Sequence, residues 1–344
     1  MTQVKARGIA TDIVTTHLYP TDDIVRNAGG GRDGFSEVIK QAAANVTSFG
    51  YPGMPLVMTE FNAGLGLPTE VNGDTPYTAA MVLHNHLALQ GVANLETLSF
   101  WSYSDLFEEG GMDSQPWHVR RRVTPRHSLA APSCCALAML SPPRRRASTH
   151  LPREFPSRRP QNGYGIMNVN GVPKPIYRFF QMLRALPAAS VPVTAQVADA
   201  QDAIVQRVGS VSAGTVDAVV AVDDSMHPLI HVTALLNNFD VYDAPGMANK
   251  TVTVVFASLP AGATVPASAI LNRIDSTHAN AVAAWNAAGN PMYCSPSEIA
   301  AEMAASQLVD EAIALTAAGS SLSVTITLEP FSVSRVRFSY SVEA

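Results

Sequence analysis

The first half of the chain alternates between two patterns of apolar and polar residues. Short β-branched or apolar runs, which are typical of buried strands, cover residues 9–17, 55–59 and 96–103. Apolar residues at helical spacing cover residues 34–49, 75–90 and 174–186. Asp74 is a candidate N-cap for the second of these helices. Because strands alternate with helices, we predict a parallel sheet with crossover helices.

The second half, residues 188–344, has a different pattern, in which short runs of Val, Thr and Ala are separated by turn residues. The clearest runs are residues 218–222, 230–236, 251–256 and 322–328. This pattern is typical of an antiparallel β-sandwich. We expect one helix within the sandwich, from about Pro296 to Gln307, and place the domain boundary near residues 187–191.

The stretch 119–161 fits neither pattern. It contains ten Arg, seven Pro, a single acid (Glu154) and no Gly. A structureless loop of this length is uncommon inside a compact domain. A basic nucleic-acid-binding loop, a disordered linker and a translated intron are the three interpretations, and the first lacks interleaved aromatic residues. We favour the translated intron, because the flanks EEGGMDSQPWH and NGYGIMNVNGVPKP form one continuous loop when the stretch is removed.

Composition and charge exclude several classes of protein. Hydrophobic residues make up 47% of the chain and charged residues 15%, so the chain can bury a sizeable core. The net charge is −5, and outside the basic stretch the chain is distinctly acidic. No apolar run approaches the roughly 18 residues that cross a bilayer, and no apolar leader follows Met1. We therefore expect no membrane partner and no nucleic-acid partner.

Cysteines and sequons give weak indications about the cellular compartment. Cys134 and Cys135 are adjacent and Cys294 stands alone, so no disulfide framework is expected. Sequons begin at Asn45 and Asn249, which is compatible with a secreted or lysosomal/vacuolar parent protein, although this chain has no signal peptide.

With residues 119–161 set aside, four segments resemble glycoside hydrolase family 39, in the order in which that family has them. They are VTTHLYP, PLVMTEFNAG, LSFWSYSDLFEEGG and NGYGIMNVNGVPKPIYRFFQML. The segment 272–293 also resembles the family's sandwich domain. The resemblance implies the C-terminal part of a (β/α)₈ TIM barrel, about strands 6–8, formed by residues 1–118 and 162–187. An antiparallel β-sandwich would follow.

Glu60 ends the run PLVMTE, which the resemblance aligns with the family's nucleophile. Catalytic side chains of a (β/α)₈ barrel stand at the C-terminal ends of its strands. The resemblance therefore implies that Glu60 attacks the anomeric carbon and forms a covalent glycosyl-enzyme, as in retaining hydrolysis. The alternative is an ordinary surface glutamate at a strand end.

Other residues at the ends of the same strands are candidates for contacts with a sugar. His17 and Tyr19 follow the first strand and are expected to bond the nucleophile or sugar hydroxyls. Trp101 offers an apolar face to a sugar ring. The candidate hydroxyl acceptors beyond the third strand are Asp105, Glu108 and Glu109.

The acid/base of retaining hydrolysis is missing from the sequence. The family supplies it from an Asn-Glu-Pro segment, and no Asn-Glu pair occurs anywhere in this chain. Three strand–helix units also fall short of the eight of a complete barrel. We therefore expect an inactive C-terminal fragment of an enzyme, and expect that the chain as written does not hydrolyse glycosides.

A neutral pentose is the favoured sugar. No Lys or Arg occurs between Phe61 and Trp117, whereas a uronate usually requires a cation in its site. The resemblance thus favours a β-xylosidase that cleaves terminal β-linked xylose from xylo-oligosaccharides or glycosides. An α-L-iduronidase-like glycosidase and a non-catalytic carbohydrate-binding or structural protein stay open. No metal or cofactor is expected, and the sequence does not indicate the oligomeric state.

Overall fold

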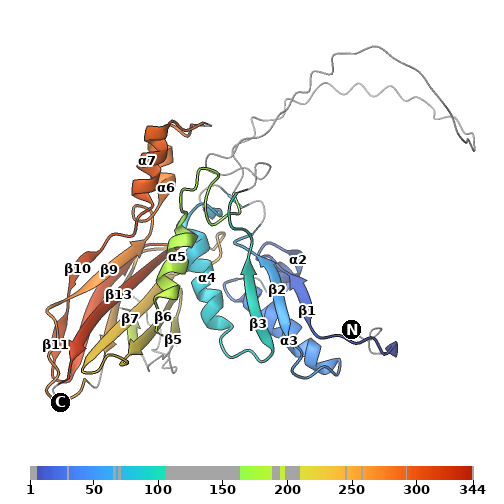
Figure 1. Cartoon of the computed structure of the whole chain (residues 1–344), viewed down its shortest axis with the longest axis horizontal. Helices are drawn as coiled ribbons and strands as arrows, with labels where there is room; N and C mark the ends of the chain where they lie inside the picture. The colour runs from blue at the N-terminus through green and yellow to red at the C-terminus, as the bar shows by residue number, and fades with distance from the viewer. Residues whose placement is uncertain are drawn as a thin grey trace, which may run out of the picture.

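The computed structural model describes residues 6–28, 31–64, 67–68, 71–105, 163–187, 194–197, 210–244, 246–256, 259–291 and 293–342. Within these residues the chain forms sheets of three, six and four strands. Figure 1 shows the three-stranded sheet on one side and the sandwich on the other, with α4 (Pro76–Ala88) and α5 (Pro175–Arg184) between them. Among the described helices, none has the length and apolar character needed to cross a membrane.

The three-stranded sheet is parallel and has the order β1-β2-β3. Its strands are β1 (Val14–His17), β2 (Leu56–Phe61) and β3 (Leu95–Phe100). The crossover from β1 to β2 contains α2 (Asp23–Asn27) and α3 (Gly34–Ser48), and α4 forms the crossover from β2 to β3. The sheet agrees with the pattern of apolar runs. Its assignment to strands six to eight of a (β/α)₈ barrel stays a prediction.

The two long crossover helices differ in how much of their surface is buried. α3 buries one face, on which Phe35, Ile39 and Val46 recur at helical spacing. In α4, every residue from Pro76 to Asn85 is buried. A helix that is buried all round lies inside a core rather than on a surface. α4 is buried on all sides because it lies between the parallel sheet and the sandwich.

The two larger sheets are antiparallel, with the orders β10-β9-β13-β7-β6-β5 and β11-β12-β8-β4. Their strands are β4 (Thr194–Val197), β5 (Ser210–Ala213), β6 (Val216–Asp223), β7 (Leu229–Asn238), β8 (Lys250–Phe256), β9 (Ser268–Ile274), β10 (Glu311–Ala314), β11 (Thr316–Ala318), β12 (Ser321–Leu328) and β13 (Ser332–Ser341). Buried residues from both sheets, among them Val220, Leu236, Val254 and Val324, form one hydrophobic cluster. The antiparallel sandwich is therefore present in the half of the chain where its pattern occurs.

The expectation of a single helix within the sandwich was wrong, because two helices are present. They are α6 (Ala281–Ala287) and α7 (Pro296–Ala305). α7 begins with a capping box, in which Ser295 and Glu298 each accept a bond from the other's backbone N–H. α6 buries only Ala281 and Trp285, which are too few anchors to produce a helical period in the sequence.

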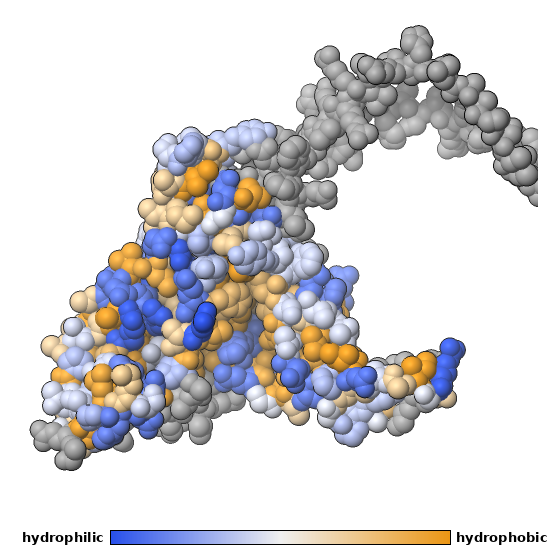
Figure 2. All heavy atoms as spheres, in the orientation of Figure 1, coloured by the Kyte–Doolittle hydropathy of each residue, from blue (hydrophilic) through white to orange (hydrophobic). Residues whose placement is uncertain are grey.

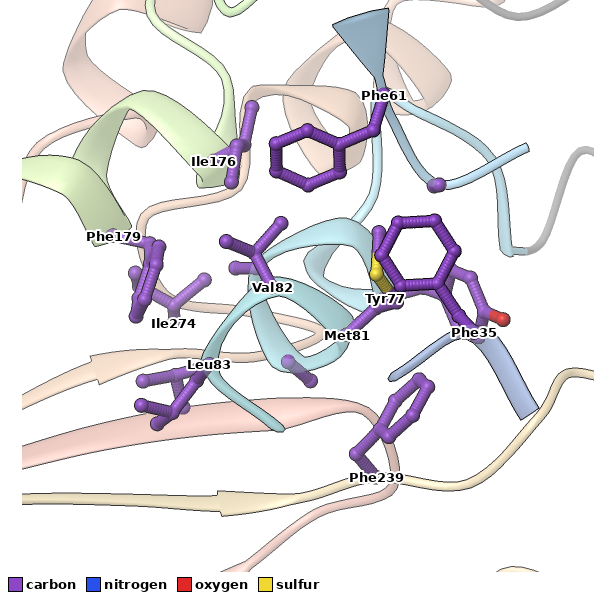
Figure 3. Close-up of a cluster of buried hydrophobic side chains, with 14 of the residues drawn as sticks. Phe35, Phe61, Tyr77, Met81, Val82, Leu83, Ile176, Phe179, Phe239 and Ile274 are labelled. Carbon is purple, nitrogen blue, oxygen red and sulfur yellow. The ribbon is translucent and has the colours of Figure 1, made fainter. Parts of the chain in front are cut away.

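α4 also packs on the outer face of the six-stranded sheet, opposite the sandwich interior. Figure 3 shows Leu83 of α4, Phe61 of β2, Phe179 of α5 and Ile274 of β9 around this contact. The rings of Tyr77 and Phe239 lie 5.6 Å apart at the start of the helix. A single buried cluster therefore runs from the parallel sheet through α4 and α5 to the sandwich.

The proposed domain limits stay predictions. Residues 188–193 and 119–161 lie outside the described residues. On either side of residues 106–162, however, the described chain makes direct contacts. The Gly165 N–H donates to Asp105 Oδ1 at 2.8 Å, and the Asp105 N–H donates to the Met167 carbonyl at 3.0 Å. Asp105 and the residues from Gly165 to Met167 therefore lie side by side in the described fold.

A buried ion cluster joins the segment before α3 to the sandwich. Arg32 bonds Asp217 of β6 and donates from Nε to the Phe239 carbonyl at 2.8 Å. His84 of α4 is buried between two carboxylates, with Nδ1 3.0 Å from Asp217 Oδ2 and Nε2 3.0 Å from Asp33 Oδ1. Burial lowers the pKa of His84, but the two carboxylates outweigh burial and the nearby Arg32, so that the pKa is raised.

A second buried ion cluster lies beyond the ends of the parallel strands. Lys174 Nζ is 2.6 Å from Asp74 Oδ1 and 2.5 Å from Asp105 Oδ1, and all three side chains are buried. The cluster joins the loops after β2 and β3 to the start of α5. The expectation that Asp74 caps α4 was wrong, because Thr75 is the N-cap residue and the Asp74 carboxylate turns to the ammonium of Lys174.

Asp105 carries an unusual pKa in this cluster. Burial raises the pKa of Asp105 to about 7, with a further contribution from the Asp74 carboxylate, although Lys174 opposes both. The folded state therefore binds a proton at Asp105 more tightly than the unfolded chain does. The stabilising effect of that proton is complete below the ordinary value of 3.8 and is lost as the pH rises through about 7.

We predict that His84 makes the stability of the chain pH-dependent on the alkaline side. Because its folded pKa lies above the ordinary value of 6.5, its stabilising effect is fully present below that pH and is lost as the pH rises through the folded pKa. Urea unfolding between about pH 6 and pH 9 should show this decline, and His84→Gln should reduce it to the part that Asp105 contributes as the pH rises through about 7. His86→Gln on the same helix is the control and should leave the decline in place, because burial lowers the pKa of His86. An equal decline in His84→Gln would contradict the prediction.

We predict that Lys174→Met destabilises the chain by about 3–5 kcal/mol, because it leaves two buried carboxylates without a cation. Asp105→Asn should cost much less, since Lys174 keeps Asp74 and an amide oxygen can still accept from Gly165. It should also remove the loss of stability between about pH 4 and pH 7. Free energies of unfolding from urea titrations measure both effects. Lys40→Met, which breaks the exposed pair with Glu37, should change stability by less than about 0.5 kcal/mol.

Candidate active site

Glu60 leaves the core because the strand pairing is irregular at this point. Leu56 and Met58 are buried, so strict alternation along β2 would bury Glu60 as well. Instead, the register of β2 against β3 shifts between Met58 and Phe61, and Phe61 takes the buried position. Irregular pairing of this kind re-aims a side chain next to active sites. The Glu60 carboxylate therefore stands at the C-terminal end of β2 and is partly exposed.

His17 faces Glu60 across the β1–β2 pair. The two residues are register partners, and a shift in the pairing falls between Thr16 and His17. His17 Nδ1 lies 3.4 Å from Glu60 Oε2, and the two side chains are 57% and 19% exposed. Within the described residues, the side chain that makes a polar contact with the Glu60 carboxylate is that of His17. A solvent-facing carboxylate beside an imidazole can act as a nucleophile or a general base.

Trp101 lies at the end of β3, next to the end of β2. Its backbone N–H donates to the Phe61 carbonyl at 2.8 Å, and its side chain is among the exposed large hydrophobic ones. His17, Glu60 and Trp101 thus occupy the same end of three neighbouring strands, and their roles at a sugar site stay predictions. Tyr19 follows β1 but is buried, and its backbone N–H donates to Asp22 Oδ2 at 2.9 Å.

Asp105 is not exposed at this end of the sheet. Its carboxylate is buried against Lys174 and the Gly165 N–H, which gives it a structural place in the fold. Its prediction as a hydroxyl acceptor is not supported by these contacts. Glu108 and Glu109 lie outside the described residues, and their roles stay predictions.

Two further residues at this end of the sheet were not identified from the sequence. Asn62 donates from Nδ2 to the Trp101 carbonyl at 3.4 Å, and its Oδ1 accepts from the Gly64 N–H at 2.8 Å. Its buried amide therefore ties the end of β2 to the end of β3. Tyr103 is 71% exposed and follows Trp101 by two residues, so the alternation of aromatics in FWSYSD could have indicated it.

Chemically, the described residues supply one carboxylate at this end of the sheet, beside an imidazole and near an exposed indole ring. Retaining hydrolysis requires a second carboxyl group about 5–5.5 Å from the nucleophile. In the part of the chain that the structure describes, no second carboxylate contacts Glu60. Among the described residues, no group of three His, Cys, Asp or Glu side chains could hold a metal ion.

Several known proteins are similar to this chain. A β-xylosidase of Caldicellulosiruptor saccharolyticus is 22% identical over 310 residues, which are 89% of this chain and 49% of that protein. The chain thus spans about half the length of this curated relative. The solved structure of a monomeric β-xylosidase from Caulobacter crescentus CB15 matches with a TM-score of 0.56 and 17% identity, over 99% of this chain and 58% of that one.

A family 39 glycoside hydrolase from Xanthomonas axonopodis pv. citri matches with a TM-score of 0.59 and 17% identity. This match covers 99% of the present chain and 56% of the other. At these identities the two structures show a shared fold and no more. The family model for glycosyl hydrolases family 39 matches residues 9–321. The resemblance found in the sequence is therefore confirmed, and the chain belongs to glycoside hydrolase family 39.

Proposed function

We propose that Glu60 is the nucleophile of a retaining glycosidase that acts on terminal β-linked xylose. The observation that carries this proposal is the position of the Glu60 carboxylate, partly exposed at the end of β2 and 3.4 Å from His17. A register shift in the strand pairing keeps this side chain out of the core. The relatives named as β-xylosidases support the choice of sugar.

In this proposal the reaction runs in two steps. The Glu60 carboxylate attacks the anomeric carbon, the bond to the leaving oxygen breaks, and a covalent glycosyl-enzyme forms. A second carboxyl group protonates the leaving oxygen. In the second step it takes a proton from a water that attacks the anomeric carbon, which breaks the bond to Glu60 and releases the sugar. The sequence has no Asn-Glu pair to supply that group, so the chain as written carries the nucleophile without its acid/base.

His17 acts in this proposal as a positioning residue, and Trp101 as a sugar-binding one. An N–H on His17 Nδ1 would donate to Glu60 Oε2 and fix the carboxylate for attack. The exposed ring of Trp101 offers an apolar face against which the C–H groups of a sugar can pack.

The charges near the site favour xylose over a uronic acid. Among the described residues that follow β2 and β3 up to the start of α5, Lys174 is a cation, and it is buried between Asp74 and Asp105. It is therefore committed to those carboxylates and does not bind a uronate. Arg178, one turn along α5, donates from Nε to the Ser306 carbonyl at 2.6 Å.

An activated xyloside tests the role of Glu60 without requiring the acid/base. Dinitrophenolate leaves without protonation, and fluorine next to the anomeric carbon slows hydrolysis of the glycosyl-enzyme. We predict that a dinitrophenyl fluoro-xyloside adds one fluoro-xylosyl group to the purified chain, and that peptide mapping by mass spectrometry places it on Glu60. An alkyl xyloside, whose leaving group needs protonation, should not be turned over.

Matched variants separate the proposed chemistry from non-specific labelling. Glu60→Gln should abolish the label, whereas Glu96→Gln, which changes an exposed glutamate on β3, should retain it. Label on another carboxylate, or equal labelling of Glu60→Gln, would overturn the proposal. So would the absence of label in a chain whose circular dichroism and cooperative unfolding show that it is folded.

A further inference from the structure

We propose that a groove on the outer face of the six-stranded sheet binds a carboxylate-bearing oligosaccharide through Arg335. This site is separate from Glu60. The inference rests on the proposed function only for the choice of a saccharide as ligand.

The groove is an open hollow of about 590 Å³. Its floor is formed by β7, β13 and β9, and Ala185 and Pro187 after α5 form one rim. Pockets for small ligands commonly have volumes of about 300–1,000 Å³, so the groove has room for a disaccharide. In Figure 2 strongly hydrophilic residues gather on the visible face of the sandwich.

The strand register places the polar residues of the groove on one face. Arg337 pairs with Thr233, and Ser339 pairs with His231, so these alternate residues of β13 and β7 point to the same side. Further along the same face, Leu235 and Val333 belong to the buried cluster that contains α4. One face of the sheet is therefore apolar where the helices cover it and polar beyond them.

Arg335 is the residue that indicates an anionic ligand. It is only 9% exposed, and its Nε and Nη2 both donate to Asn272 Oδ1, at 3.1 and 2.7 Å. Asn272 is neutral, and in the described chain no carboxylate bonds the Arg335 guanidinium. A buried cation without a charged partner is costly. A ligand carboxylate in the groove would supply the missing charge in the bidentate geometry that a guanidinium favours.

Asp310 attracts Arg335 electrostatically, but its carboxylate is bonded to other groups. Asp310 Oδ2 bonds Arg337 Nη2 at 2.7 Å, and Asp310 Oδ1 accepts from Asn272 Nδ2 at 2.7 Å. Burial, and then the like charge of Arg337, lower the pKa of Arg335, although Asp310 opposes them. Asp223, a carboxylate that lines the groove, lies on β6 across from His231, away from Arg335 along the strands.

The rest of the groove suits a saccharide better than a bare anion or a nucleic acid. Hydroxyl groups of Thr233, Ser268 and Ser339 line it beside His231, whose Nδ1 lies 2.6 Å from Ser339 Oγ. Asp223 can accept bonds from sugar hydroxyls but would repel a second phosphate. From Arg335 to Ser339 the strand rises about 13 Å, which matches a carboxylate at one end of a short oligosaccharide.

Calorimetry with a glucuronosyl-xylose disaccharide tests this proposal, with neutral xylobiose and inorganic phosphate as comparison ligands. The wild-type chain should bind the acidic disaccharide at least about tenfold more tightly than either comparison ligand. Arg335→Gln should weaken that binding by about tenfold or more. Arg273→Gln is the matched control, because Arg273 pairs with Glu311 and does not line the groove.

A second variant covers the case in which Arg335→Gln does not fold. Ile270 is a partly exposed residue of the groove and pairs with Arg337 in register, so Ile270→Glu places a carboxylate there with little cost to the core. This variant should abolish binding. Glu60→Gln should bind normally, which separates this site from the proposed nucleophile. Equal binding of xylobiose or phosphate, no binding at millimolar ligand, or full binding by Ile270→Glu would overturn the proposal.

Discussion

The burial of α4 on two sides is the contact on which the rest of the structure depends. On one side α4 covers the parallel sheet that presents Glu60, and on the other it packs against β13, β7 and β6 of the sandwich. The hydrophobic effect stabilises a fold in proportion to the apolar area that is removed from water. Here the area buried against the parallel sheet and the area buried against the sandwich both belong to one helix, α4. The position of the strand ends is therefore coupled to the sandwich, although the two parts have different architectures.

Most of the fold could be predicted from local pattern. Alternation in runs such as those of β8 and β12, and the helical period of α3, depend only on which face of each element is buried. α6 could not be predicted, because its short sequence buries only Ala281 and Trp285. The capping role expected for Asp74 was wrong for a related reason. A distant Lys174 competes for its carboxylate, and no local pattern shows that competition.

The part of the candidate site that lies at the strand ends could be predicted from the sequence. Glu60, His17 and Trp101 each end an apolar run, so their shared place follows from a parallel sheet. The shift that turns Glu60 outward depends on pairing with β3 and could not be derived from one strand. The lack of a carboxylate bonded to Arg335 in the described chain is equally non-local, since it depends on Asp310 being bonded to Asn272 and Arg337.

The contact between Asp105 and Gly165 has a consequence for insertions at this point of the chain. Because the fold itself brings these two residues together, a flexible connection placed between them would change stability with its length mainly through loop-closure entropy. That entropy grows logarithmically, by about 0.6 kcal/mol for each doubling of length. Lengthening such a connection would therefore have a small free-energy cost compared with breaking the Lys174 cluster beside it.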